Sequence, residues 1–305
     1  MMKKINILLV GCGRFGRNHL RVLKELEKEE TIQLKGIVVK SDESKKKIEK
    51  EYPSLVYTAL TDSLLKNIDA VDIVTPASTH VELIKKCLPY CHILVEKPLA
   101  LSAAEIEELQ QLEKRYHKKI MVGHIFRFNA AVKELKKRIN ENGALKEISG
   151  FFISSGEAPY DCGALHDELH LFDILDFILE ENPTKGNMKI LKKTKQDFEE
   201  LAIIRLKYPS VPNVTLMLGW RKEEKERSLK ISYDDKILLC DLLTQTIKEK
   251  SEIREVETSY FVEEPLKEEI KAFINVIHGN IEQFPDTNTA LRIQKVIDII
   301  KENEN

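Results

Sequence analysis

A glycine-rich loop near the start of the chain constrains its fold more than any other segment. The sequence GCGRFG at residues 11–16 follows an apolar run at 5–10 and opens an amphipathic stretch. In that context a G-x-G-x-x-G pattern predicts a strand, a tight turn and a helix that together bind a dinucleotide. Gly11 permits the turn, Gly13 lets the backbone approach a pyrophosphate, and Gly16 lets the helix pack on the strand. The alternative is a turn that only joins strand to helix.

The first 122 residues alternate short apolar runs with helical patterns, which is typical of parallel strands joined by crossover helices. The expected strands are residues 5–10, 32–39, 55–57, 70–74, 92–95 and 119–122, and the expected helices are 15–28, 43–51, 79–88 and 102–117. Ser102 and Glu105 form a capping box at the start of the last helix. The pattern predicts an α/β fold with a doubly wound parallel sheet, a Rossmann domain.

After Gly123 the pattern changes to longer β-rich runs. The expected strands are 148–154, 201–208, 214–220, 229–232 and 237–242, with helices at about 166–179, 266–278 and 287–302. Consecutive strands predict a mostly antiparallel, open sheet in an α+β domain. A chain of 305 residues is long for one core. We therefore expect two domains, 1–122 and 123–305, that pack directly and leave a cleft.

Charge and cysteine content exclude several classes of function. With 48 basic and 50 acidic residues the net charge is -2, so we expect no binding to nucleic acid or to anionic membranes. The Met-Met-Lys-Lys start and the short apolar runs predict neither a signal peptide nor a membrane span, and hence a cytoplasmic protein. The five cysteines are scattered, so reduced thiols are expected. Cys87, Cys91 and His92 lack a second ligand pair, and we expect no metal.

The end of the second expected strand bears on the choice of cofactor. NAD-specific domains place an acid there to hold the ribose 2′-hydroxyl. Here Lys40 and Ser41 stand at this point, and they can hold a 2′-phosphate by charge and hydrogen bonds, with Arg14 nearby. The alternative is that Lys40 is a solvated loop lysine and Asp42 reaches the ribose. We favour NADP over NAD.

Two segments carry groups suited to proton transfer. Lys97, in Glu96-Lys97-Pro98, follows a buried strand at the sheet edge where such folds bind ligands. Partial burial there lowers a lysine pKa enough to exchange a proton with a hydroxyl. The alternative is a strand-end lysine paired with Glu96.

The second segment spans residues 163–173. If it is one helix, Asp167, His170 and Asp173 share a face, and a carboxylate beside an imidazole makes a general acid/base. The alternative is a helix start with a dipole-favoured acid and a structural histidine.

Together these segments resemble the glucose–fructose oxidoreductase, inositol dehydrogenase and MocA (Gfo/Idh/MocA) family over nearly the whole chain. The resemblance is carried by the glycine loop, the segment at 70–80, Glu96-Lys97-Pro98, the segment at 122–129, the Asp167/His170 helix and Glu264-Pro265-Leu266. It implies a Rossmann domain and an open-sheeted second domain that supports homodimers or homotetramers. It further implies oxidation or reduction of a secondary hydroxyl of a sugar, polyol or nucleotide sugar.

The resemblance also implies roles for individual residues. Lys97 is similar to the lysine that contacts substrate and nicotinamide, and His170 to the acid/base histidine. Asp167 resembles the accompanying carboxylate, although the Asp167–His170 spacing is one residue shorter than in many members, which leaves His166 as an alternative. The implied cofactor contacts, with those of the glycine loop and second strand, are Gly11, Gly13, Arg14, Phe15, Gly16, Lys40, Ser41, Thr75, Pro76, His80, Glu96 and Lys97.

Our hypothesis is that the substrate lies between Lys97 and His170, with Asp167 holding the imidazole tautomer. Arg127 and Tyr160 are candidate substrate contacts, since an arginine suits an anionic group and a tyrosine packs on a sugar face. Two rival functions stay open, because fold alone does not determine substrate. One is a reductase of a cyclic imine or tetrapyrrole, and the other a non-catalytic NADP(H)-binding sensor.

Overall fold

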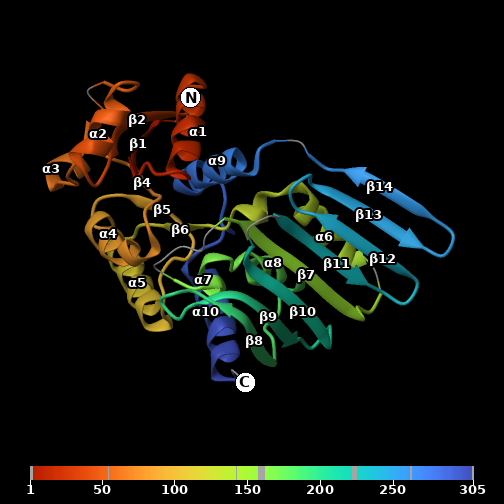
Figure 1. The fold of residues 1–305 in the computed structure, drawn as a ribbon. Coiled ribbons are helices and arrows are strands. Elements are labelled where there is room, and N and C mark those ends of the chain that lie inside the picture. Colours follow the sequence, from red (N-terminus) through yellow and green to blue (C-terminus); the bar gives the residue numbers. More distant parts are fainter. Residues whose placement is uncertain are drawn as a thin grey trace. The chain divides into compact units, whose positions relative to one another are not determined.

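The chain forms two compact units (Figure 1). The computed structural model describes residues 3–53, 55–141, 143–156, 162–221, 225–261 and 263–303. Unit 1 comprises Met1–Gly123 and Leu266–Ala290, and unit 2 comprises His124–Pro265 and Leu291–Asn305. Within the described ranges, no helix combines the length and the apolar character that a membrane span requires.

Unit 1 is built on a six-stranded parallel sheet. The strands are β1 (Ile5–Val10), β2 (Ile32–Val38), β3 (Val56–Tyr57), β4 (Ala70–Ile73), β5 (His92–Glu96) and β6 (Ile120–Gly123), in the order β3-β2-β1-β4-β5-β6. Every residue of β4 and β6 is buried, as expected when helices cover both faces of a parallel sheet. The predicted doubly wound sheet is confirmed.

The helices of unit 1 follow the predicted crossovers. They are α1 (Gly16–Lys28), α2 (Asp42–Glu49), α3 (Asp62–Leu65), α4 (His80–Cys87), α5 (Ala103–Tyr116) and α9 (Pro265–Ile277), with the short 3₁₀ helix η1 (Ala77–Thr79). Ser102 Oγ accepts a hydrogen bond from the amide of Glu105, which caps α5 as predicted. The four-residue helix α3 is too short to show a helical period, and it was not predicted.

The first unit includes a segment from late in the chain. The sequence placed all of residues 123–305 in the second domain, whereas Leu266–Ala290 packs with residues 1–123. Lys267 of α9 pairs with Glu29 beyond α1 at 2.9 Å, and the two helices lie side by side in Figure 1. The amide of Val122 in β6 donates to the carbonyl of Pro285 at 2.8 Å. The late segment therefore completes the covering of the sheet.

Unit 2 contains an eight-stranded mixed sheet. Its strands are β7 (Glu147–Ser155), β8 (Lys185–Lys193), β9 (Glu199–Lys207), β10 (Asn213–Arg221), β11 (Glu226–Ser232), β12 (Lys236–Asp241), β13 (Thr246–Ser251) and β14 (Glu255–Ser259), in the order β14-β13-β12-β11-β7-β10-β9-β8. Only the β7–β10 pair in this sheet is parallel. The predicted, mostly antiparallel sheet is confirmed.

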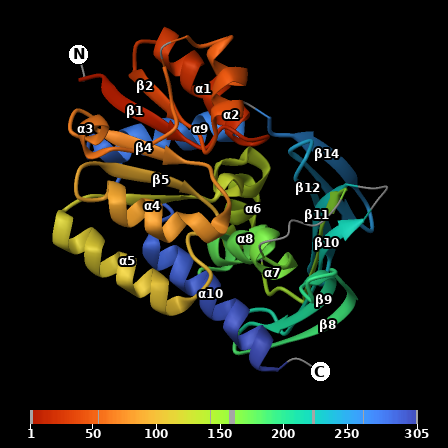
Figure 2. The ribbon, with the colours of Figure 1, turned by 60° about the vertical axis from the view of Figure 1, so that its left-hand side comes forward.

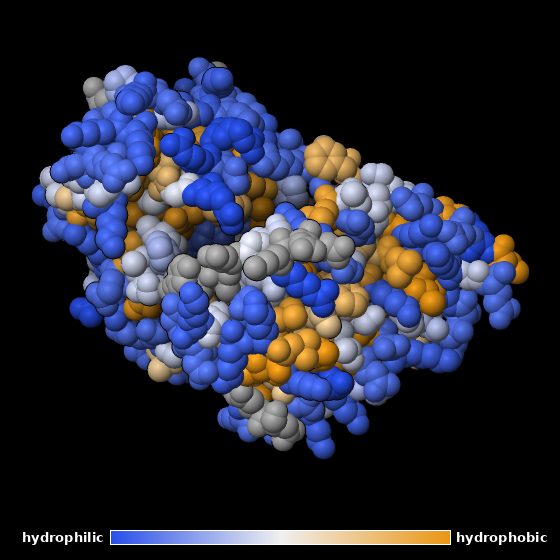
Figure 3. Space-filling model, viewed as in Figure 1, coloured by the Kyte–Doolittle hydropathy of each residue, from blue (hydrophilic) through white to orange (hydrophobic). Residues whose placement is uncertain are grey.

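The two faces of this sheet differ. Figure 2 shows α6 (Ala130–Glu141), α7 (Ala164–Asp167) and α8 (His170–Leu179) along one face. In β7, Ile148 and Phe152 are fully buried on that face, while Phe151 points the other way and is 36% exposed. Figure 3 shows apolar side chains among charged ones over the outward face. The helix α10 (Thr287–Glu302) has residues in both units.

One predicted element of unit 2 requires correction. The expected helix at 166–179 is two helices, because α7 ends at Asp167 and α8 begins at His170. The amides of Phe172 and Asp173 both bond to the carbonyl of Leu169, which starts a new helix there. Asp167 therefore does not share a helix face with His170, whereas Asp173 follows His170 by three residues on α8.

Candidate functional site

In the glycine loop, the backbone is closely packed at Gly11 and Gly16 and open at Gly13. Gly11 has φ +96°, and a Cβ there would lie 2.5 Å from the carbonyl oxygen of Val74. A Cβ at Gly16 would lie 2.4 Å from the Gly11 oxygen, whereas one at Gly13 would meet nothing within 4 Å. The approach to Gly13 and the N-terminus of α1 is thus free for an anionic group. These residues fit the pyrophosphate of a dinucleotide.

Residues 40–42, which lie just beyond β2, are exposed. Lys40, Ser41 and Asp42 are all exposed, as are Arg14 and Phe15 in the glycine loop. The Ser41 hydroxyl already accepts a hydrogen bond from the amide of Ser44 and caps α2. This leaves Lys40 as the exposed cation at the strand end.

A buried charged cluster lies below the carboxyl ends of β4 and β5. His19 of α1 contacts Asp72 Oδ2 through Nδ1 at 2.8 Å and Glu96 Oε1 through Nε2 at 3.2 Å. His19 and Asp72 have no exposed surface, and Glu96 is 8% exposed. Burial opposes the ring's charge, but Asp72 and Glu96 outweigh it by attraction and hydrogen bonding, which holds the pKa of His19 well above its usual value.

This cluster was not predicted from the sequence, because the partners of His19 are 53 and 77 residues away. The signal available was a histidine three residues after Gly16, on the face of α1 that packs on the sheet. The cluster joins α1 to the two strands that precede the predicted cofactor loop and Lys97. It therefore orients the carboxyl edge of the sheet.

Lys97 is half-buried and follows Glu96 directly. Beside it, the fully buried His80 contacts the carbonyls of Pro98 and Thr75, each at 2.8 Å. Burial lowers the pKa of His80, although the two carbonyls oppose this effect. The His80 side chain links the Thr75 loop to the Lys97-Pro98 segment, and its predicted contact with the cofactor stays a prediction.

In unit 2, His170 packs against two phenylalanines. Its ring centroid lies 4.7 Å from that of Phe152 and 5.0 Å from that of Phe126. Asp167 is half-buried at the end of α7. The neighbouring His166 contacts Gln294 Oε1 at 3.3 Å, and burial lowers its pKa to about 4. His166 is therefore a neutral, buried residue directed at α10.

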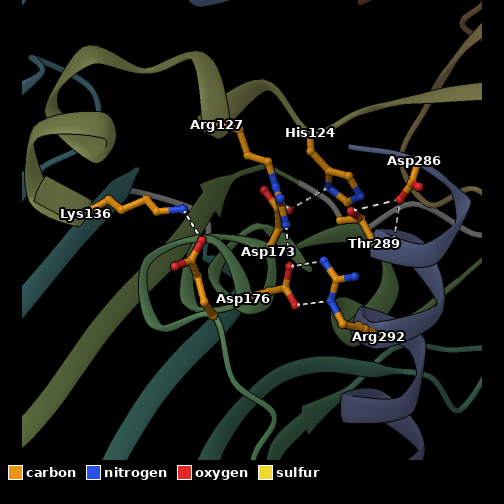
Figure 4. A network of polar contacts seen from close by, with 9 residues as sticks. His124, Arg127, Lys136, Asp173, Asp176, Asp286, Thr289 and Arg292 are labelled. Atoms are coloured by element: carbon orange, nitrogen blue, oxygen red, sulfur yellow. Dashed lines mark hydrogen bonds and ion pairs between the residues drawn. The ribbon is translucent and has the colours of Figure 1, made fainter. Parts of the chain in front are cut away.

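Arg127 is held by carboxylates (Figure 4). Its guanidinium donates to Asp173 Oδ1 and to Asp176 Oδ2, each at 2.6 Å. Arg292 also donates to Asp176, from Nε to Oδ1 at 2.7 Å and from Nη2 to Oδ2 at 2.9 Å. His124 Nδ1 lies 3.4 Å from Asp173. Arg127 thus anchors α8 one turn beyond His170, and its predicted contact with substrate stays a prediction. Tyr160, the other predicted contact, lies outside the described residues.

Among the described residues, no group of three or more His, Cys, Asp or Glu side chains is arranged so that it could hold a metal ion. Cys87 and Cys91 are fully buried. Burial raises the pKa of Cys87 to about 12 and also raises that of Cys91. Both are therefore neutral thiols packed beside β5.

Residues 5–124 match the model of an oxidoreductase family with an NAD-binding Rossmann fold, GFO_IDH_MocA. The N-terminal domain belongs to the Gfo/Idh/MocA family. The glycine loop, the buried His19 cluster and Glu96 all fall within this match. Unit 1 therefore carries a fold built for a nicotinamide dinucleotide.

Curated relatives match part of this chain and part of their own length. A UDP-N-acetylglucosamine 3-dehydrogenase from Acidithiobacillus ferrooxidans is 29% identical over 42% of this chain and 40% of its own. A scyllo-inositol 2-dehydrogenase (NAD(+)) from Bacillus subtilis is 35% identical over 41% of this chain and 40% of its own. The chain spans less than two thirds of the first relatives' lengths, at 40%, 62% and 60%.

Solved structures of similar fold cover the whole chain. The UDP-N-acetylglucosamine 3-dehydrogenase GnnA from A. ferrooxidans has a TM-score of 0.87 at 21% identity, over 99% of this chain and 98% of its own. An aldose-aldose oxidoreductase from Caulobacter crescentus has a TM-score of 0.86 at 17% identity, over 98% and 97%. At these identities the likeness establishes the fold alone.

Proposed function

We propose that the protein is an NAD(P)-dependent oxidoreductase that acts on a secondary hydroxyl or keto carbon of a sugar, polyol or nucleotide sugar. The observation that carries the proposal is the family's Rossmann domain with Lys97 at the carboxyl end of β5, beside a loop open to a dinucleotide. Relatives named as UDP-N-acetylglucosamine and inositol dehydrogenases support the substrate class. A bound nicotinamide would supply or accept the hydride.

In this proposal Lys97 and His170 carry out the transfer of the hydroxyl proton. His170 takes the proton during oxidation and returns it during reduction, and Lys97 assists by hydrogen bonding to the same oxygen. Asp167 holds the imidazole tautomer. Asp173, paired with Arg127, keeps the first turn of α8 in position.

The test is steady-state kinetics of Lys97→Ala and His170→Ala on a panel of sugars, polyols and nucleotide sugars with NADPH, NADH and the oxidised cofactors. We expect each variant to lose about 100-fold or more in turnover, the usual size of a general acid/base contribution, while cofactor binding measured by calorimetry stays intact. His278→Ala, at the end of unit 1's last helix, is the matched control. Unchanged turnover in both variants would contradict the assignment.

For the cofactor, we propose NADP in preference to NAD. The support is the exposed Lys40 and the absence of an acid at Val39 and Lys40. Calorimetric titration should give tighter binding of NADPH than of NADH, and Lys40→Glu should reverse the order. Equal affinities in the unaltered protein would remove this preference.

We also propose that the protein is a homo-oligomer that uses the outward face of the unit 2 sheet. Phe151 stands beside Met217, which stands beside Ile203, in one row across three strands on that face. A half-exposed apolar row suits a self-complementary interface. Sedimentation of the unaltered chain and of Phe151→Lys checks this, and a monomer at micromolar concentration would contradict it.

A further inference from the structure

An arginine of unit 2 points inward where the sheet otherwise buries apolar side chains. In β11, Leu229 and Ile231 face the core at 1% and 0% exposure. Arg227 occupies the same face, because alternate residues of a strand share a side. Its partner in register is Phe152 of β7, which is fully buried. A charge at such a position needs a physical reason.

Among the described residues, the Arg227 guanidinium donates one hydrogen bond, although it carries five N–H groups. The guanidinium carbon lies 4.3 Å from the ring centroid of Phe152, and Nη2 donates to Ser154 Oγ at 3.3 Å. Its Nε is buried without a hydrogen-bond acceptor, and no carboxylate in the described part of the chain forms an ion pair with it. A buried charge without a close counter-ion is costly.

Nearby acids compensate this charge only in part. Burial lowers the pKa of Arg227, and the more distant Glu168 and Asp167 oppose that shift without cancelling it. An arginine has five N–H donors in a planar fork that fits an oxyanion. A negative group arriving beside Phe152 would therefore meet a half-buried guanidinium whose Nε has no acceptor among the described residues.

The location of Arg227 connects it to the candidate acid/base. His170 and the guanidinium pack on the same ring, with 4.7 Å and 4.3 Å from the Phe152 centroid. Both groups also lie against Phe126, at 5.0 Å and 5.9 Å from its centroid. Arg227 and His170 therefore pack against the same pair of phenylalanine rings.

We propose that Arg227 binds an oxyanion, a carboxylate or a phosphoryl group, carried by the substrate of the His170 site. The inference rests on the proposed function, since it takes His170 as the proton-transfer group. It narrows the substrate to acidic members of the sugar class, namely sugar acids, sugar phosphates and nucleotide sugars.

The test measures binding by calorimetry to the full chain saturated with NADPH. The ligands are two matched pairs: glucuronate with glucose, and UDP-N-acetylglucosamine with N-acetylglucosamine. We expect one acidic ligand to bind at least about tenfold more tightly than its neutral partner, as hydrogen bonds to charged groups allow. Which pair shows the preference distinguishes a carboxylate from a phosphoryl group.

Variants then assign the preference to Arg227. Arg227→Gln should abolish it and leave the neutral ligand's affinity unchanged, and Arg227→Lys should restore it in part. Lys230→Gln is the control, because Lys230 lies on the same strand and faces outward. Thermal unfolding checks that each variant folds, and Arg227→Lys serves alone if the glutamine variant does not.

Two results would overturn the proposal. One is equal affinity for the acidic and neutral members of both pairs in the unaltered protein. The other is an acidic preference that survives in the Arg227 variants. Acidic binding that depends on Arg227 without any hydride transfer would instead count against the proposed oxidoreductase function and leave the oxyanion site standing.

Discussion

Replacing His19 by glutamine should destabilise unit 1 strongly and change how its stability depends on pH. The side chain is completely buried between Asp72 and Glu96. Removing one partner from a buried ionic cluster typically costs about 3–5 kcal/mol. For a domain of this size each kcal/mol shifts the melting temperature by about 2–4 °C, so we expect a loss of roughly 6–20 °C.

The pH dependence follows from the raised pKa of His19. The folded state holds the ring's proton more tightly than the unfolded state, where the pKa is near 6.5. The cluster's stabilisation is therefore complete below pH 6.5 and declines as the pH rises through the higher folded-state value. His19→Gln has no such proton to lose, so this decline should disappear.

The assay is thermal unfolding of the full chain between pH 6 and 9 at constant ionic strength, followed by circular dichroism. His278→Gln, half-exposed at the end of α9, is the control and should match the unaltered protein. A His19→Gln protein that melts within about 2 °C of the unaltered chain, or that shows the same alkaline decline, would refute the reasoning.

Two further predictions concern the glycine loop and the α8 anchor. Gly11→Ala should cost more than about tenfold in NADPH affinity by calorimetry, because the new Cβ would lie 2.5 Å from the Val74 oxygen at a φ of +96°; an unchanged dissociation constant would contradict this. Asp176→Asn should cost about 3–5 kcal/mol in urea unfolding, since Arg127 and Arg292 lose their shared carboxylate. Burial opposes the charge of Asp176, but Arg292 and Arg127 outweigh it and hold the pKa of this carboxyl below 3.8. The unaltered protein should therefore lose this stability only as the pH falls below that value. If the variant unfolded with the same dependence on acid pH, the assignment would be excluded.

The parallel sheet was predictable because its strands are buried on both faces. β1 and β4 are apolar runs with one polar residue each, Asn6 and Asp72, and such runs are easily recognised as strands in a sequence. The strands β8, β13 and β14 were missed because they are rich in lysine and glutamate. Their β structure depends on pairing with a neighbouring strand, and a single sequence does not display that register.

The site was predictable where its chemistry is local in sequence. Glycine spacing identified the loop, and the strand pattern placed Lys97 directly after β5. Arg227 was missed because the predicted strand began at Leu229, which left the arginine outside it. Only the register that pairs Arg227 with Phe152 shows that it faces the core.

The return of Leu266–Ala290 to unit 1 has a consequence for synthesis of the protein. A ribosome that has released residue 123 has not yet supplied Pro285 for the amide of Val122, or Thr287 for the carboxylate of Glu113. The dinucleotide domain therefore cannot be completed before nearly the whole chain has been translated, although N-terminal domains usually fold first. Neither unit is a continuous module that a single cut could transplant into another protein.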